Sequence, residues 1–339
     1  MHKKLLIHIG YPKTATTSLQ LNLFNDLNKI GKIEYLNHLN NPSTGYLGNY
    51  YVKNVLQSIV SNNNIPENEI KNELQALNTI DKDISVISAE TLSFWYPGFS
   101  YSLINSNAKQ NAQKFRDIFL PYFDIIEILI GIRAQQTLLR GCYKQWYYLI
   151  TGENPKFTKI DNWLNANIYS KTDTDNLGFN FNVLISEYMQ TFGKANTHIL
   201  VYEDLLHDKT NYLKKLSQIF NINISFVYKS LLKEKQNSSI LTSNGVETEN
   251  ATIGQIITQP FRHIIKKRFS DSTFNTLKKL YHGIIPSSID KKRTARKAVI
   301  RDLTQKEKDL ILEKYRDSNL RLIERFDLDK NKMKKYGYI

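Results

Sequence analysis

A stretch near the start of the chain combines residue types that bind phosphate or sulfate groups. It reads GYPKTATTSLQ over residues 10–20, with one ammonium group at Lys13 and three consecutive hydroxyls over Thr16–Ser18. An apolar run precedes the stretch and a helical pattern follows it. The N–H groups and the dipole of a helix N-terminus hold anions. The stretch therefore predicts a phosphate or sulfate site.

The same stretch differs from the Walker loop of ATPases and GTPases. Counted from Gly10, the pattern G-x-x-x-x-G-K-[ST] places glycine at position 15 and lysine at position 16. These positions hold Ala15 and Thr16, and the lysine of the stretch, Lys13, lies three residues before Thr16. The spacing argues against an ATPase or GTPase, and a P-loop-like kinase with a degenerate loop stays open as an alternative.

Residues 12–20 closely resemble the 5′-phosphosulfate loop of sulfotransferases that use 3′-phosphoadenosine 5′-phosphosulfate (PAPS). In that family the lysine contacts the leaving phosphate and the bridging oxygen, while loop amides and hydroxyls hold the 5′-phosphate. The resemblance implies a catalytic and cofactor-binding role for Lys13. It also implies that PAPS contacts the next five residues, Thr14, Ala15, Thr16, Thr17 and Ser18.

Ile132-Arg133 resembles the 3′-phosphate segment of the same family, in which a strand ends in arginine and a serine follows eight positions later. A guanidinium group suits bidentate phosphate binding, so Arg133 fits the first element. The eighth position holds Gly141, which has no hydroxyl. Arg140 or Lys144 could supply the missing contact from the helix that follows.

Three later segments also resemble this family. Lys235-Gln236-Asn237-Ser238-Ser239 is similar to the K-x-N-x-S loop that returns to the nucleotide in many membrane-type and bacterial members. That likeness implies that Lys235, Asn237 and Ser239 bind the cofactor. The segments 201–205 and 326–338 are similar to a Tyr-Glu-Asp-Leu segment and to the C-terminus of bacterial members.

Sulfuryl transfer to an alcohol needs a base near the acceptor hydroxyl. Glu90 follows the apolar run Ile84–Ser88, which places its carboxylate at the sheet edge where open α/β folds bind ligands. Several glycan-modifying and bacterial sulfotransferases are similar in this respect, so we expect Glu90 to be the base. His8 is the second candidate, because cytosolic small-molecule sulfotransferases use a histidine. Aromatic residues at 94–96 could form a platform for a sugar or an aryl acceptor.

Four apolar runs rich in Ile, Val and Leu predict strands that are buried on both faces of a parallel sheet. They span Lys4–Ile9, Ile84–Ser88, Ile125–Ile132 and Thr197–Tyr202. Helical patterns lie between them, which indicates an α/β fold with helices flanking the sheet.

Two of the helical patterns are specific enough to name residues. In one, Leu19, Leu23, Phe24 and Leu27 share a face and Gly31 follows as a stop. In the other, a capping-box pattern opens at Thr304 and places Leu310, Ile311 and Tyr315 on one face. We expect loops or loosely ordered insertions over Ser61–Asn72 and Ser238–Asn250.

The 339 residues carry 46 Lys+Arg against 32 Asp+Glu, a net charge of +14. Twelve basic and two acidic residues lie between Arg262 and Arg301, so this segment could contact an anionic glycan or a membrane surface. We expect one sulfotransferase domain over 1–339, with a basic helical insertion at 251–301. The single cysteine, Cys142, excludes an internal disulfide.

These features predict a PAPS-dependent sulfotransferase that modifies a hydroxyl, with a carbohydrate as the expected acceptor. The resemblance implies no bound metal, and the seven histidines show no metal-ligand spacing. No apolar stretch approaches 18 residues and the start lacks a cleavage site, so we expect a cytosolic protein. A polyanion-binding or membrane-binding protein is the rival from another class, and nucleic acid is not an expected partner.

Overall fold

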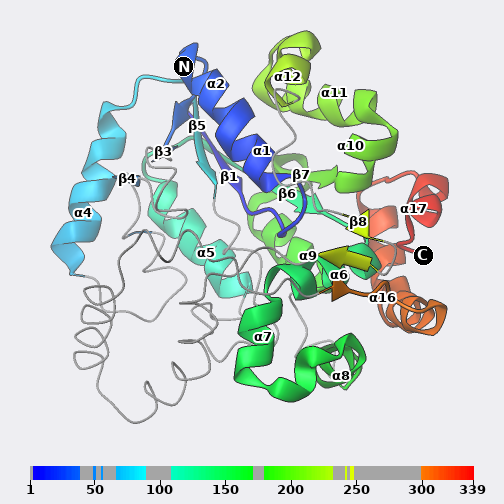
Figure 1. Cartoon of the computed structure of the whole chain (residues 1–339). Helices are drawn as coiled ribbons and strands as arrows, with labels where there is room; N and C mark the ends of the chain where they lie inside the picture. The colour runs from blue at the N-terminus through cyan, green and yellow to red at the C-terminus, as the bar shows by residue number, and fades with distance from the viewer. Residues whose placement is uncertain are drawn as a thin grey trace.

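The computed structural model describes residues 3–38, 49–50, 55, 66–88, 108–170, 179–231, 241–242, 245–247 and 299–339 (Figure 1). Its centre is a five-stranded sheet in the order β2-β5-β1-β6-β7, in which all neighbouring strands are parallel. In spatial order the strands are β2 (Glu34–Tyr35), β5 (Ile84–Ser88), β1 (Lys4–His8), β6 (Ile125–Ile132) and β7 (Thr197–Val201). The four predicted strands and the α/β class are confirmed. The two-residue strand β2 is too short to show a pattern in the sequence.

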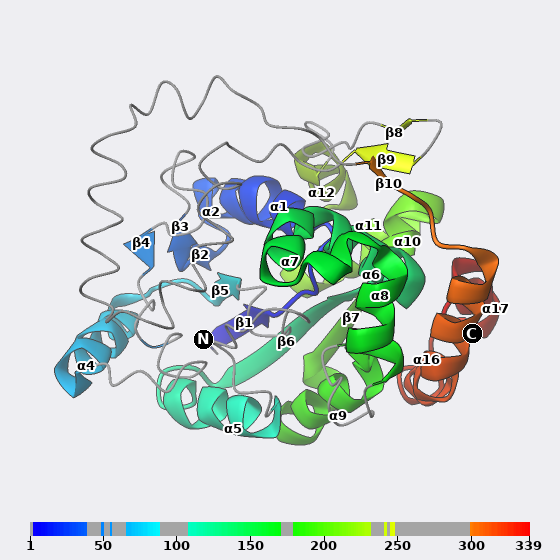
Figure 2. The same ribbon diagram turned by 60° about the horizontal axis from the view of Figure 1, so that its bottom comes forward.

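The two faces of the sheet carry separate hydrophobic clusters, because alternate strand residues point to opposite sides. On β1, Leu5 and Ile7 pack with residues of α5 (Ala108–Phe119) and α9 (Phe181–Phe192). Leu6 packs on the other side. That second cluster draws on the helices that follow β1 and on α11 (Lys209–Phe220) and α12 (Ile224–Leu231). The two layers are visible on opposite sides of the sheet in Figure 2.

The chain after β1 is helical without a break from residue 16 to residue 29. It comprises α1 (Thr16–Ser18), the π-helical segment η1 (Leu19–Phe24) and α2 (Asn25–Lys29). The four apolar residues predicted to share a face are all fully buried. Gly31 follows with a φ of 71°, the left-handed conformation that suits a helix end. The predicted helix and its stop are confirmed.

The C-terminal segment forms α16 (Gln305–Arg325) and α17 (Lys330–Tyr336), which lie on the β7 side of the sheet (Figure 1). The capping box at Thr304 is present, with Glu307 as its second member. Ile311 and Tyr315 are buried as predicted, but Leu310 is 38% exposed. The prediction for Leu310 was wrong because the buried stripe follows the helical period through residues 311, 315, 318 and 322.

Two segments predicted to be loops contain regular structure. Helix α4 (Glu67–Ala76) covers the second half of the predicted loop Ser61–Asn72. Strands β8 (Leu241–Thr242) and β9 (Gly245–Glu247) lie within the other one. Both predictions were wrong at these residues.

Strand β10 (Val299–Ile300) pairs antiparallel with β9 and sets Val299 opposite Glu247, so the chain leaves and returns at the same place. The expected basic insertion lies between these points, and all of it except 299–301 falls outside the described residues. The remaining elements are β3 (Asn37–His38), β4 (Asn49–Tyr50), η2 (Leu77–Thr79), α6 (Gln135–Gln145), α7 (Tyr147–Glu153), η4 (Pro155–Thr158), α8 (Ile160–Leu164), η5 (Asn165–Tyr169), η7 (Lys194–Asn196) and α10 (Tyr202–His207).

Candidate functional site

The loop between β1 and α1 has a backbone conformation suited to an anion. Lys13 and Ala15 have φ values of 64° and 66°, and the helix begins directly afterwards at Thr16. The left-handed region costs a residue with a Cβ about 1–2 kcal/mol, so the surrounding contacts must hold both residues there. Turns of this kind point backbone N–H groups towards one concavity, and the helix N-terminus adds its own N–H groups.

Two of the predicted cofactor-binding hydroxyls hold the loop itself. The Oγ1 atom of Thr14 donates to the carbonyl of Tyr11 at 2.5 Å, and Oγ1 of Thr16 donates to the same carbonyl at 3.4 Å. Both threonines are 2% exposed. Thr17 and Ser18 are half-buried, and neither hydroxyl makes a hydrogen bond in the part of the chain that the structure describes. Unlike Thr14 and Thr16, these two hydroxyls are therefore not used by the described part of the chain to hold the loop.

Strand β6 supports the loop from the side. The N–H of Tyr11 donates to the carbonyl of Gly131 at 3.1 Å, which extends the β1–β6 pairing into the loop. A Cβ atom at Gly131 would lie 2.7 Å from Oγ1 of Thr14. Only glycine therefore lets Thr14 approach β6 this closely, and the loop rests directly on the strand that ends in Arg133.

Arg133 reaches across to the loop from the end of β6. Its Nη1 atom donates to the carbonyl of Lys13 at 3.0 Å, and its Nε atom donates to Oγ1 of Thr137 at 2.9 Å. The guanidinium carbon lies 4.5 Å from the centre of the Tyr202 ring, a cation–π contact. Among the described residues, Nη2 has no hydrogen-bond partner. The structure thus brings Lys13 and Arg133 together and leaves one guanidinium edge for another group.

Gly141 lies against the side chain of Lys13. A Cβ atom added at Gly141 would be 3.3 Å from Cγ of Lys13, which is a tight contact. Glycine at this position therefore gives the stem of Lys13 room beside α6. Arg140, which could have replaced the missing serine hydroxyl, is already engaged: its Nη2 atom lies 2.9 Å from the Asp302 carboxylate.

His8 is fully buried beneath the loop. Its Nδ1 atom lies 2.7 Å from Oγ of Ser88, which also accepts a hydrogen bond from Nε2 of Gln20 at 2.9 Å. Burial lowers the pKa of the imidazole to about 3, so the ring is neutral. A Cβ atom at Gly10 would lie 2.6 Å from Nε2 of His8, so the loop can cross the ring because Gly10 has no side chain. In this arrangement His8 has no contact with solvent, from which an acceptor would arrive.

Four of the candidate residues fall outside the described residues: Glu90, Lys235, Asn237 and Ser239. The described range 66–88 ends at Ser88, at the carboxyl end of β5 and two residues before Glu90. Since β5 is the direct neighbour of β1, this strand end lies beside the start of the loop. Ser88 and Gln20, which sequence reasoning did not single out, fix that strand end to the helix after the loop.

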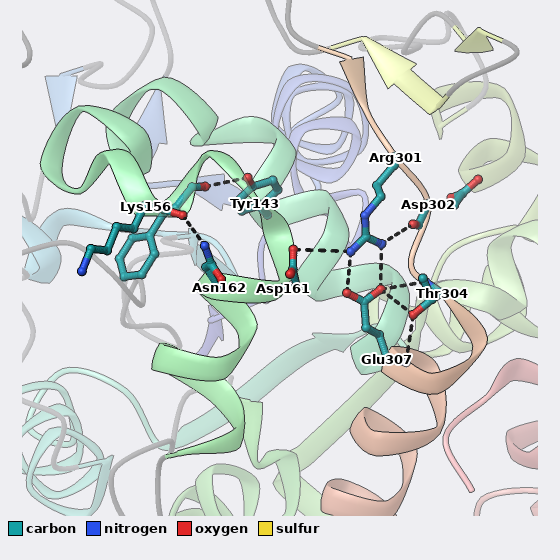
Figure 3. Close-up of polar contacts among 9 residues, drawn as sticks. Tyr143, Lys156, Asp161, Asn162, Arg301, Asp302, Thr304 and Glu307 are labelled. Carbon is teal, nitrogen blue, oxygen red and sulfur yellow. Dashed lines mark hydrogen bonds and ion pairs between the residues drawn. The ribbon is translucent and has the colours of Figure 1, made fainter.

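The chain that returns from the basic segment is anchored beside α6 and α8 (Figure 3). Arg301 donates to both carboxylate oxygens of Glu307, at 2.8 and 2.6 Å, and lies 3.6 Å from Asp161. The Arg301 guanidinium lowers the pKa of the Glu307 carboxyl to about 2. Of the twelve basic residues counted in the sequence, Arg301 is the one described, and its charge is directed towards these acids (Figure 3).

Comparisons with known proteins give few matches. No family model matches the sequence, and no curated protein matches it. One similar solved structure is that of a sulfotransferase from Alicyclobacillus acidocaldarius, with 8% sequence identity and a TM-score of 0.46 over 98% of this chain and 100% of that one.

Within the described ranges, no helix is both long and apolar enough to cross a membrane. Those residues also contain no group of three or more His, Cys, Asp or Glu side chains that could hold a metal ion.

Proposed function

We propose that the chain is a sulfotransferase that moves the sulfuryl group of PAPS to a hydroxyl acceptor. The observation that carries this proposal is the hydrogen bond from Arg133 to the carbonyl of Lys13, between residues 120 positions apart in sequence. These residues belong to the two segments that resemble the 5′-phosphosulfate and 3′-phosphate segments of the family. Their contact supports a single site in which Lys13 and Arg133 would bind two separate anionic groups.

The residues present fit the two anionic ends of PAPS. Lys13, the hydroxyls of Thr17 and Ser18, and the N–H groups at the start of α1 would hold the phosphosulfate end. Thr14, Ala15 and Thr16 would shape that loop, and Arg133, beside Gly141, would hold the 3′-phosphate. Lys235, Asn237 and Ser239 are proposed to bind the nucleotide. When bound, PAPS supplies the activated sulfuryl group.

Each charged side chain then has a distinct task. The ammonium of Lys13 would neutralise the charge that develops on the departing phosphate, a role in which one preorganised donor is worth about 10²–10³ in rate. Glu90 is the proposed base that takes the acceptor proton. His8 is the second candidate, but burial opposes the charged form that a base must reach.

We also propose a carbohydrate as the acceptor. This rests on the glutamate after β5, the aromatic residues at 94–96 and the likeness to glycan-modifying members, and not on a described contact. The remaining parts of the proposal are one sulfotransferase domain over 1–339, a location in the cytoplasm, and contact of residues 262–301 with an anionic glycan or membrane surface.

The test is transfer of labelled sulfate from PAPS to a panel of glycans. Lys13→Ala should lower turnover by about 10²–10³, since it removes the proposed charge partner and little packing. Lys29→Ala is the matched control, because Lys29 ends the helical segment that follows the loop and its side chain is 75% exposed. Near-normal turnover by a folded Lys13→Ala protein would contradict the cofactor assignment. Mg²⁺-dependent transfer from ATP, without sulfate transfer, would replace the proposal with the kinase.

A further inference from the structure

The residue after Arg133 is hydrogen-bonded to a buried carboxylate that lies just beyond the end of the neighbouring strand. Glu203, which follows the end of β7, is 6% exposed, and its Oε1 atom accepts a hydrogen bond from the N–H of Ala134 at 3.1 Å. Its Oε2 atom accepts a hydrogen bond from the hydroxyl of Tyr338 at 2.9 Å. Tyr202, directly before Glu203, provides the ring beneath the Arg133 guanidinium. Two consecutive residues, Tyr202 and Glu203, therefore contact Arg133 and the residue that follows it.

Tyr338 is itself held firmly. It is fully buried, and its N–H donates to the carbonyl of Met333 at 3.0 Å. Its own carbonyl accepts from Nδ2 of Asn319 at 2.8 Å. The side-chain amides of Asn319 and Gln135 exchange two hydrogen bonds of 3.0 Å, so α16 is also bonded to the first residue of α6. The backbone of Tyr338 is thus held independently of Glu203, and its side chain is buried.

Arg133 and the Tyr338 hydroxyl act on the same carboxyl group. Burial raises the pKa of Glu203, while its hydrogen bonds and the charge of Arg133 act in the opposite direction. A buried carboxylate that loses a hydrogen-bond donor must find another partner, because an unsatisfied buried carboxylate lowers the stability of the fold. Among the described residues, Arg133 is the cation that acts on Glu203. Without the Tyr338 hydroxyl, a carboxylate that turned to Arg133 would neutralise the guanidinium.

We propose that Tyr338 is a positioning residue that holds the Glu203 carboxylate away from Arg133 and so keeps the guanidinium available for a phosphate group of the ligand. This inference rests on the proposed function, because it takes the 3′-phosphate of the nucleotide as the group that Arg133 binds. Tyr338 does not touch the ligand, and its effect passes entirely through Glu203 and Arg133.

The experiment compares adenosine 3′,5′-bisphosphate with adenosine 5′-phosphate by calorimetry. The measured quantity is the dissociation constant of adenosine 5′-phosphate divided by that of the bisphosphate. This ratio isolates the contribution of the 3′-phosphate. Tyr338→Phe should lower this ratio about tenfold, the effect of losing one hydrogen bond to a charged group, and should leave the affinity for adenosine 5′-phosphate unchanged. Tyr336→Phe is the control, since its hydroxyl bonds to Asp204 at 3.2 Å and not to Glu203.

Two double variants test whether the effect of Tyr338 passes through Glu203 and Arg133. In an Arg133→Ala background, Tyr338→Phe should have no further effect on the ratio, because the residue through which it acts is absent. Adding Glu203→Gln to Tyr338→Phe should restore the ratio, because a neutral amide of the same shape cannot neutralise Arg133. A merely structural tyrosine would not be rescued by removing a second polar partner.

The outcomes separate the inference from the function on which it rests. An unchanged ratio in Tyr338→Phe, or equal weakening of both nucleotides, overturns the inference. If Tyr338→Phe does not fold, Glu203→Gln alone decides: a ratio equal to or above wild type supports the inference, and a lower ratio overturns it. A wild-type protein that binds both nucleotides equally refutes the assignment of Arg133 in the proposed function, whatever the variants do.

Discussion

The space around Gly141 gives a prediction in which turnover falls while stability changes little. Gly141 lies within α6, and a Cβ atom there would sit 3.3 Å from Cγ of Lys13. Gly141→Ala adds this one atom. Gly141→Ser adds the same atom and the hydroxyl that the family has at this position, so the pair separates crowding from hydrogen bonding.

The expected magnitudes follow from two opposing terms. Alanine in place of glycine inside a helix contributes about 0.5–1 kcal/mol to stability. The crowded Lys13 stem must move by a few tenths of an ångström, and an off-rotamer side chain costs about 0.5–1.5 kcal/mol. The free energy of unfolding of Gly141→Ala should therefore stay within about 1 kcal/mol of wild type. Turnover should fall about tenfold, since misplacement of a catalytic group by 1 Å can cost about 10²-fold.

The assay measures kcat and KM for PAPS alongside urea unfolding of each variant. Gly141→Ser should lose turnover as Gly141→Ala does, while its hydroxyl can strengthen binding of adenosine 3′,5′-bisphosphate. In a Lys13→Ala background neither substitution should change turnover further, because the crowded side chain is gone. Turnover by Gly141→Ala at or above the wild-type level would refute the reasoning, as would an undiminished loss in the Lys13→Ala background.

Two further predictions concern metal dependence and acid stability. Turnover with PAPS should persist in EDTA, because Lys13, Arg133 and the loop N–H groups supply the positive charge; loss in EDTA and rescue by Mg²⁺ would instead favour the kinase. Glu307→Gln should lower the free energy of unfolding at pH 7 by about 1–2 kcal/mol, since Arg301 stabilises the ionised carboxyl. The Glu307 pKa is lowered from 4.5 to about 2, so this contribution is present above pH 4.5 and is lost as the pH falls towards 2. Urea unfolding should show the wild type and variant converging at the acid end, and a constant difference across that range would contradict the assignment.

Most of the sheet could be predicted because its strands are buried on both faces and appear as uninterrupted apolar runs. Helix α4 was missed for a different reason: asparagine-rich composition favoured a loop, although Glu67 and Glu69 follow Pro66 in the order typical of a helix start. Strands β8 and β9 are two and three residues long and derive from pairing with each other and with β10. Pairing partners of this kind leave no local pattern in the sequence.

For the candidate site, too, local sequence patterns allow some predictions and tertiary contacts decide the rest. Residue types and spacing predicted roles for the loop and for Arg133, but they could not show which hydroxyls turn inwards. Thr14 and Thr16 bond to the carbonyl of Tyr11 because the backbone is left-handed at positions 13 and 15, and nothing in the residue types requires that. The contact between Glu203 and Tyr338 spans 135 positions and depends on how α16 and α17 pack, so no motif could have revealed it.

The arrangement around Arg133 explains why an arginine suits this place. A guanidinium has a rigid fork of five N–H donors. The protein takes one from Nε, towards Thr137, and one from Nη1, towards the carbonyl of Lys13. The face of the group lies over the Tyr202 ring. These contacts hold the plane of the fork and leave the Nη2 side, so a phosphate group would meet a donor set that is already oriented. A lysine ammonium has three donors on a flexible stem and could not both hold the loop and present a fixed edge. The same contacts make the Lys13 loop depend on Arg133, so the two proposed anion-binding places would be coupled through one hydrogen bond.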